Sequence, residues 1–157
     1  MEREEIEKEY KWNLSDIYKN YDIWNKDFEK VKKLKEELIS YKGTFSIEEK
    51  LLEFFKKEEE LDKIAYKLYR YPQLAKDIDS LDKEAVENMQ KIQFLFSEIS
   101  TDLSWVNSEL IDNREKIEIY ILKDEFSNYR FKLENLFRQQ EHVLEENESK
   151  LMSYFSS

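Results

Sequence analysis

The sequence has no cysteine and only one glycine, one proline and one histidine among its 157 residues. Without cysteine it can form neither disulfides nor thiolate metal sites, which agrees with a reducing cytoplasm. A single glycine excludes the glycine-rich phosphate loops and the G-x-S-x-G nucleophile turn, because each of those motifs needs more than one. No apolar run approaches the ~20 residues of a membrane span, and the charged start MEREEIEKEY is unlike a signal peptide. We therefore expect a cytoplasmic protein with no membrane partner.

Charge and aromatic content further limit the kinds of protein that this sequence can encode. Charged residues make up 39% of the chain, and 36 acidic against 26 basic residues give a formal net charge of −10. An acidic surface repels phosphate backbones, and no Lys/Arg stripe is interleaved with exposed aromatics, so we expect no nucleic-acid partner. Ten Phe, ten Tyr and three Trp supply far more ring surface than a disordered acidic chain carries. The composition therefore predicts a folded protein.

The spacing of apolar residues predicts an all-α fold. They recur at intervals of three and four, and no stretch alternates with period two. We predict five or six antiparallel helices and no sheet, forming one compact domain over residues 1–157. Gly43 is expected to end the first long helix with a positive φ, and Pro72 to end or kink the second. The third helix is expected to be capped by Asp79 or Ser80.

The stretch RQQEHVLEENESK contains the only histidine and looks like an inverted zinc motif, H-x-x-E-H, whose second histidine is missing. A catalytic zinc needs about three protein ligands, and here every ligand except His142 would be a carboxylate, a set that suits Mg²⁺ or Mn²⁺ better. We therefore interpret His142 as part of a connector. Glu145 and Glu146 would lie in the first turn of a final helix, where the helix dipole stabilises negative charge. No catalytic residue and no metal ligand is predicted in this chain.

One tyrosine-rich stretch, AYKLYRYPQL, provides the candidate contact surface. Tyr66, Tyr69, Arg70 and Tyr71 come close together beside the expected break at Pro72. Such a group of rings with one cation suits contact with a peptide. The alternative, and the commoner arrangement, is that the rings pack on the core face of a helix with their hydroxyls at its edge.

Four stretches of the chain resemble, in order and spacing, the N-terminal region of oligoendopeptidase F. That family belongs to the thimet-oligopeptidase-like (M3) zinc metallopeptidases. The likeness covers nearly the whole chain and rests on the order of the stretches, since none of them is a sharp catalytic motif. The closing stretch contains Arg138, His142, Leu144 and Leu151 in what we interpret as a structural helix junction. The stretches are YKWNLSDIYKNYDIWNKDFEKV, YKGTFSIEEKLLEFF, LYRYPQLAKDIDSLD and YRFKLENLFRQQEHVLEENESKLMS.

The resemblance implies that this chain has a structural role in a peptidase and contributes no catalytic residue. The family hydrolyses short peptides with a zinc ion held by an H-E-x-x-H helix, whose glutamate acts as general base. This sequence has no H-E-x-x-H, so no catalytic or zinc-binding residue carries over. The intact parent is expected to be a zinc peptidase, and the chain alone is not expected to be an enzyme. The implied role is one wall of a channel for short peptides, with the C-terminal catalytic domain of the same polypeptide as partner.

A free-standing helical scaffold or coiled-coil module is the alternative from a different class. In that case the apolar seams would mate with a partner helix. The breaks at Gly43, at Pro72 and at the stretch SWVN divide the seams into short helices. This favours a domain over a long coiled coil, and both hypotheses remain open from the sequence.

Overall fold

The computed structural model describes residues 14–155, with side chains described as far as Lys150. Within this range all regular structure is helical and no strand occurs, which confirms the all-α prediction. None of the described helices is long and apolar enough to cross a membrane. After a helical turn at 14–17 the elements are α2 (Tyr21–Ile39), α3 (Glu48–Ile78), α4 (Lys83–Asp102), α5 (Val106–Asp112), α6 (Arg114–Tyr120), the 3₁₀ turn η1 (Asp124–Phe126) and α7 (Arg130–Phe155).

The helices form two compact units. Unit 1 comprises the described residues up to 40 together with 56–104, and unit 2 comprises 41–55 together with the described residues from 105 on. The chain passes from one unit to the other within α3. The prediction of a single domain over 1–157 stays a prediction.

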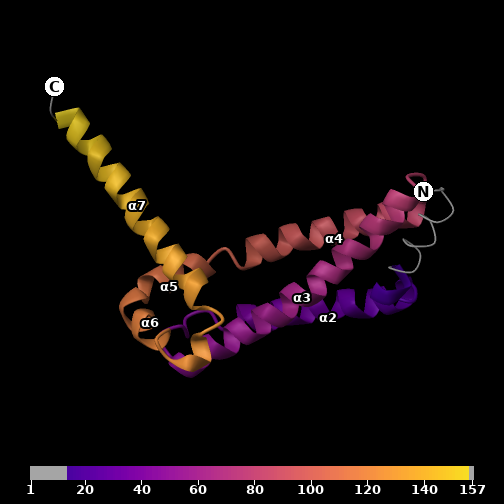
Figure 1. Ribbon diagram of the computed structural model, residues 1–157, viewed down its shortest axis with the longest axis horizontal. Coiled ribbons are helices and arrows are strands. Elements are labelled where there is room, and N and C mark those ends of the chain that lie inside the picture. The colour runs from indigo at the N-terminus through magenta and orange to yellow at the C-terminus, as the bar shows by residue number, and fades with distance from the viewer. Residues whose placement is uncertain (1–13, 156–157) are drawn as a thin grey trace, which may run out of the picture. The chain divides into compact units, whose positions relative to one another are not determined.

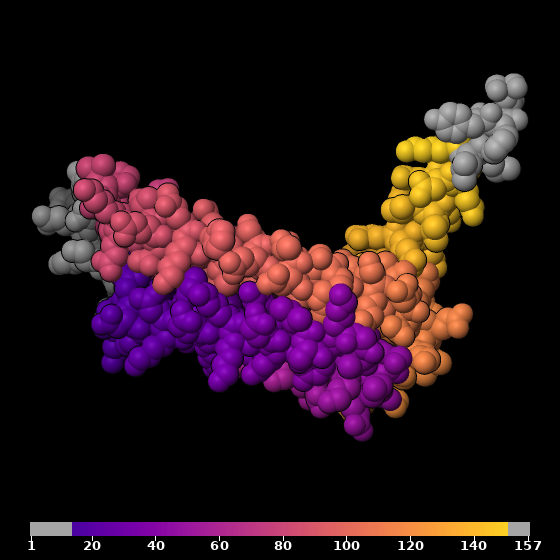
Figure 2. Space-filling view, turned by 180° about the vertical axis from the view of Figure 1, so that it is seen from behind, coloured from indigo at the N-terminus to yellow at the C-terminus, as the bar shows by residue number. Residues whose placement is uncertain are grey.

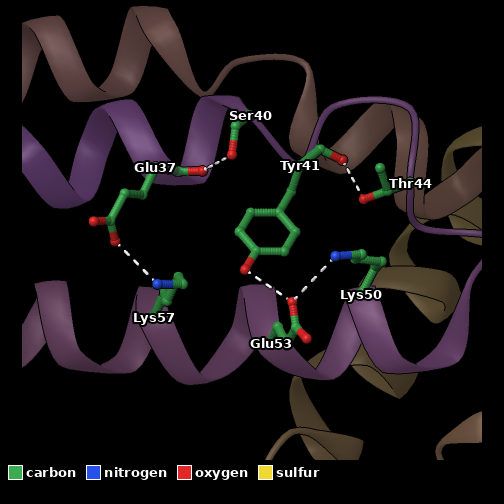
Figure 3. Close-up of polar contacts among 7 residues, drawn as sticks. All are labelled: Glu37, Ser40, Tyr41, Thr44, Lys50, Glu53 and Lys57. Atoms are coloured by element: carbon green, nitrogen blue, oxygen red, sulfur yellow. Dashed lines mark hydrogen bonds and ion pairs between the residues drawn. The ribbon is translucent and has the colours of Figure 1, made fainter.

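In unit 1, α2 and α3 lie side by side and run in opposite directions (Figure 1). The indole N–H of Trp24, near the start of α2, donates to the carbonyl of Leu68, far along α3, at 2.8 Å. At the other end of α2, Glu37 pairs with Lys57 at 3.0 Å (Figure 3). Since the partner number falls as the α2 number rises, the two helices are antiparallel, as predicted.

The third helix of unit 1, α4, runs parallel to α2, and the two lie next to each other in the space-filling view (Figure 2). Asn25 accepts a hydrogen bond from Lys91 at 3.0 Å, and further along both helices Lys35 reaches Asp102 at 3.0 Å and Glu98 at 3.7 Å. Lys35 is only 7% exposed. A buried ammonium is tolerated when carboxylates surround it, so these contacts set the register of α2 against α4.

The predicted apolar face of α2 is the face that packs in unit 1, because its members return to one side of the helix every three or four residues. The spacing predicts that Trp24, Phe28, Val31, Leu34, Leu38 and Tyr41 share this face. The first five are buried, whereas Tyr41 lies beyond the end of α2 and is half-buried. The other core side chains of unit 1 come from the residues before α2 and from the two partner helices: Tyr18, Leu61, Ala65, Leu68, Tyr71, Leu74, Ala85, Met89, Ile92 and Leu95.

Of the two effects predicted for Pro72, an end or a kink of the helix, an end is not found, because α3 continues six residues further to Ile78. A proline inside a helix lacks the N–H that would donate to the carbonyl four residues earlier, which here belongs to Leu68. The indole N–H of Trp24 donates to that same carbonyl. A side chain from α2 thus replaces the hydrogen bond that Pro72 removes, which allows the helix to run on.

The start of α4 also differs from the prediction. Its N-cap is Asp82, whose carboxylate accepts from the N–H of Ala85 at 3.1 Å. Asp79 instead accepts from the N–H of Leu81 in the turn before the helix. Asp79 and Asp82 have the same capping chemistry, so the sequence alone could not decide between them.

Unit 2 is built around aromatic rings. Phe45 and Phe54 lie 4.8 Å apart in an edge-to-face arrangement, and Trp105 lies 5.4 Å from Phe45. Phe55 stacks on Tyr129 at 5.1 Å. Edge-to-face and offset-stacked rings add to the free energy gained by burial alone. The buried aliphatic and aromatic side chains from the remaining elements of this unit are Leu51, Val106, Leu110, Ile117, Ile121, Phe126, Leu133 and Phe137.

Residues 41–47 form the loop before α3. Gly43 has the predicted positive φ, +85, but it does not end the helix as predicted, because α2 ends at Ile39 with Ser40 as its C-cap. The carboxylate of Glu109 on α5 accepts from the backbone N–H of Gly43 and from that of Phe45. Thr44 donates to the carbonyl of Tyr41, whose hydroxyl in turn donates to Glu53 (Figure 3). These contacts hold the loop in the shape that brings Phe45 into the core.

The prediction of a connector at His142 is wrong. α7 is continuous from Arg130 to Phe155, so His142 lies inside a helix and Glu145 and Glu146 do not begin one. The imidazole of His142 lies 3.2 Å from Glu146 one turn on, and both side chains are exposed. Two members of the resembling stretches, Trp12 and the side chain of Leu151, lie outside the described residues.

Candidate peptide-contacting surface

The four predicted contact residues lie on α3 within unit 1, but not all on the same face. Residues three and four apart share a helix face, so Tyr66, Tyr69 and Arg70 lie together, whereas Tyr71 is rotated toward the core. Tyr66 is 66% exposed and Tyr71 only 8%. Tyr69 and Arg70 are half-buried. Three of the four residues therefore remain candidates for surface contact.

Tyr71 belongs to a cluster of rings in the core of unit 1. Its ring centroid lies 4.9 Å from that of Tyr21 and 5.5 Å from that of Tyr18, both in edge-to-face geometry. The hydroxyl of Tyr18 donates to Asp27 at 2.7 Å. For Tyr71, core packing with the hydroxyl at the edge, the alternative set out from the sequence, is therefore the arrangement found.

The exposed part of the surface continues from α3 onto α4. The ring of Tyr69 lies 6.2 Å from that of Phe96, tilted by 33°. Arg70 donates to the side-chain oxygen of Gln73 at 3.0 Å, which fixes the guanidinium along the helix. Tyr66, one turn earlier, leaves most of its ring in contact with water. The arrangement offers aromatic faces and one cation, which bind apolar side chains and carboxylates without demanding a particular sequence.

A groove between α2 and α4 lies on another side of unit 1. It has a volume of about 480 Å³, and Phe28 and Leu95 lie at its base. The ring of Phe94 at its edge is 67% exposed. The ammonium groups of Lys32 and Lys91 lie 5.2 and 4.4 Å from the centre of the Phe28 ring. Glu87 and Glu98 also line the groove, so side chains of both charges surround its apolar residues, which suits a ligand with an apolar group and polar groups.

The sequence did not predict this groove, because the predicted apolar face of α4 is rotated relative to the face that is buried. The apolar spacing of this segment predicts that Val86, Met89, Ile92, Phe96, Ile99 and Leu103 face inward. Met89 and Ile92 are buried, together with Ala85 and Leu95, and the other four expected residues are half-buried. Phe94, Leu95 and Phe96 are consecutive, and three consecutive helical residues cannot all face one core. That run was the signal that at least one aromatic ring of α4 faces solvent.

Alkaline pH is expected to unfold unit 1 through its buried tyrosines. Burial raises the pKa of Tyr18, Tyr21 and Tyr71 above the ordinary value near 10, and the hydrogen bond to Asp27 raises that of Tyr18 further. Because the folded state holds these protons more tightly, their contribution is complete below about pH 10 and is lost as pH rises further. The last part of the tyrosinate absorbance change, which comes from these three residues, should therefore coincide with the loss of far-UV circular dichroism in an alkaline titration. Ionisation of all ten tyrosines with the helices intact would contradict this.

No metal centre is built by the described side chains. Among residues 14–150, no group of three or more His, Asp or Glu side chains is arranged to hold an ion. His142 faces solvent on α7 with Glu146 beside it.

Comparison with known proteins places these observations in a family context. Over 155 residues, 97% of the chain, the sequence is 27% identical to the oligopeptidase PepF of Bacillus subtilis (strain 168). The model for the N-terminal part of the M3 peptidases, described as oligopeptidase F, matches residues 113–157. The chain resembles the N-terminal domain of oligoendopeptidase F. It spans 23% of the length of that curated relative, and no solved structure matches it significantly.

The two matches cover different parts of the two units. The family model covers α6, η1 and α7, all of them in unit 2, whereas the alignment with PepF also takes in unit 1 and its tyrosine-rich face. The alignment with PepF therefore spans the candidate contact residues Tyr66, Tyr69 and Arg70, of which Tyr69 and Arg70 also lie in the resembling stretch LYRYPQLAKDIDSLD.

Proposed function

We propose that this chain is the non-catalytic, N-terminal helical domain of a cytoplasmic zinc oligopeptidase and forms part of the wall of its peptide channel. The observation that carries the proposal is the alignment with an oligopeptidase over 97% of the chain and only 23% of the relative. The partner is the C-terminal catalytic domain of the same polypeptide. That domain supplies the zinc and the H-E-x-x-H glutamate, because this sequence contains no such motif.

The exposed side chains of unit 1 support a passive role in peptide contact. Tyr66, Tyr69 and Arg70 on α3 and the groove edged by Phe94 present ring faces and cations. Ring faces bind many side chains with little selectivity, and the cations favour peptide carboxylates. A wall of this kind admits short peptides of varied sequence. The hydrolysis itself takes place at the zinc ion of the catalytic domain.

The native size of the polypeptide tests this proposal directly. An antibody raised against the chain would be used to capture the protein from cells of its own organism, and the captured protein would be sized and sequenced by mass spectrometry. We expect a polypeptide far above 19.4 kDa that contains an H-E-x-x-H motif and cleaves short peptides only with zinc bound. A product of about 19.4 kDa would contradict the proposal and favour the free-standing scaffold.

A further inference from the structure

The apolar stripe of α7 continues beyond the core that it serves. Leu133 and Phe137 are buried in unit 2. Steps of three and four along the same face lead to Gln140 and then to Leu144, which is 53% exposed. In the sequence Leu151 follows seven residues later. A face that packs in the first half of the helix therefore extends into the second half.

The outer half of α7, residues 141–155, has little support from the rest of unit 2. Every residue from 141 to 150 is exposed. In both views the part of the helix drawn in yellow extends away from the other helices of its unit (Figures 1 and 2). The ion pair between Arg114 and Glu141 lies at its base. The end of a helix without tertiary packing frays easily, so a partner that covers this segment would stabilise it.

A groove beside the base of this segment would extend the docking face. It has a volume of about 510 Å³ and lies between α7 and the junction of α5 with α6. Leu144 and Gln140 line it from α7 and Ile111 lines it from α5, and the rest of its lining is polar or charged: Asp112, Asn113, Arg114, Glu115 and Lys116. The side chain of a partner helix that follows the α7 stripe would enter this groove. The stripe and the groove thus form one continuous surface.

Charge determines which kind of partner fits. Between Glu141 and Lys150 the segment has four glutamates and one lysine. Two copies of this segment packed together would bring like charges close, which disfavours a homodimer through α7. An apolar surface bordered by lysine or arginine would be attracted to it instead.

We infer that the outer half of α7 is a docking helix for an apolar, basic-bordered surface in the remainder of a longer oligopeptidase polypeptide. This inference rests on the proposed function. The family match supports the choice of occupant, because it covers residues 113–157 and so includes the unsupported segment, and the relative is more than four times as long as the chain.

Amide hydrogen exchange on the isolated chain and on the captured full-length polypeptide tests the inference. Residues 141–155 are expected to exchange at least about tenfold more slowly in the full-length polypeptide, and residues 130–137 at the same rate in both. Equal exchange of 141–155 in the two would overturn the docking helix and leave the proposed function intact. If no polypeptide longer than the chain exists, both proposals fall.

Two variants of the full-length polypeptide sharpen this test. Leu144→Asp should abolish the extra protection of residues 141–155, because it places a charge in the apolar stripe. Gln139→Asp adds the same charge to an exposed position on another face of α7 and should leave the protection unchanged. Equal loss of protection in both variants would overturn the assignment of the face. An isolated chain that dimerises, and becomes monomeric with Leu144→Asp, would make a second copy the occupant and also overturn the inference.

Discussion

Replacing Trp24 with alanine is expected to lower the free energy of unfolding of unit 1 by about 3–5 kcal/mol. The indole is fully buried and stacks on Phe28 with ring centroids 5.4 Å apart. Its removal leaves a cavity and also leaves the carbonyl of Leu68 without the donor that Pro72 cannot provide. Urea unfolding followed by far-UV circular dichroism measures the loss. Ile23→Ala, the neighbouring and partly exposed residue, is the control and should cost less than about 1 kcal/mol.

A double-mutant cycle separates the hydrogen bond from the packing. Trp24→Phe keeps a ring but removes the indole N–H, and Pro72→Ala restores a backbone N–H that donates to Leu68. We expect Trp24→Phe to cost about 0.5–1.5 kcal/mol less in the Pro72→Ala background than in the original chain. Equal costs in the two backgrounds would show that the indole does not compensate for the proline.

Pro72 shows where local sequence rules stopped being sufficient. The apolar spacing of α2 and the positive φ of Gly43 follow from interactions within a few residues, and both were predicted correctly. The effect of Pro72 depends on Trp24, which is 48 residues away in the chain and supplies the missing donor. No pattern near the proline encodes that contact, so the sequence pointed to a break where the structure has a continuous helix.

The error at His142 has a different origin. The polar stretch after Phe137 suggested a connector, because polarity on every side is typical of loops. The stripe through Gln140 and Leu144 nevertheless keeps helical spacing, and α7 runs through it. A helix that is exposed on nearly all sides is indistinguishable from a loop by composition. Only its register, continuous with Leu133 and Phe137, distinguishes it.

The candidate contact surface was partly predictable, because helical spacing can be inferred from the sequence. The spacing of Tyr66, Tyr69 and Arg70 places them on one face of a helix. The separate position of Tyr71 also follows from that spacing once the helix is known to pass Pro72. The groove edged by Phe94 depends on how α2 packs against α4, which no local pattern gives.

Replacing Glu109 with alanine is expected to destabilise unit 2 by about 1.5–3 kcal/mol, the usual range for hydrogen bonds to a charged group. Its two carboxylate oxygens accept from the backbone N–H groups of Gly43 and Phe45. Without them both donors lose their partner, and the loop no longer holds Phe45 between Phe54 and Trp105. The loss is measured as a shift in the urea midpoint, with near-UV circular dichroism reporting the aromatic packing of this unit.

Two further variants distinguish the hydrogen bonds that Glu109 accepts from the loop from the effect of its negative charge alone. Glu109→Gln keeps one acceptor oxygen but faces the second N–H with an amide that cannot accept, so it should cost less than the alanine variant. Asp112→Ala removes an exposed carboxylate at the C-terminal end of the same helix, where the helix dipole disfavours negative charge, and should be neutral or slightly stabilising. If Glu109→Ala and Asp112→Ala have equal effects, the hydrogen bonds to the loop contribute nothing and the shape of residues 41–47 is set by Gly43 and the aromatic core alone.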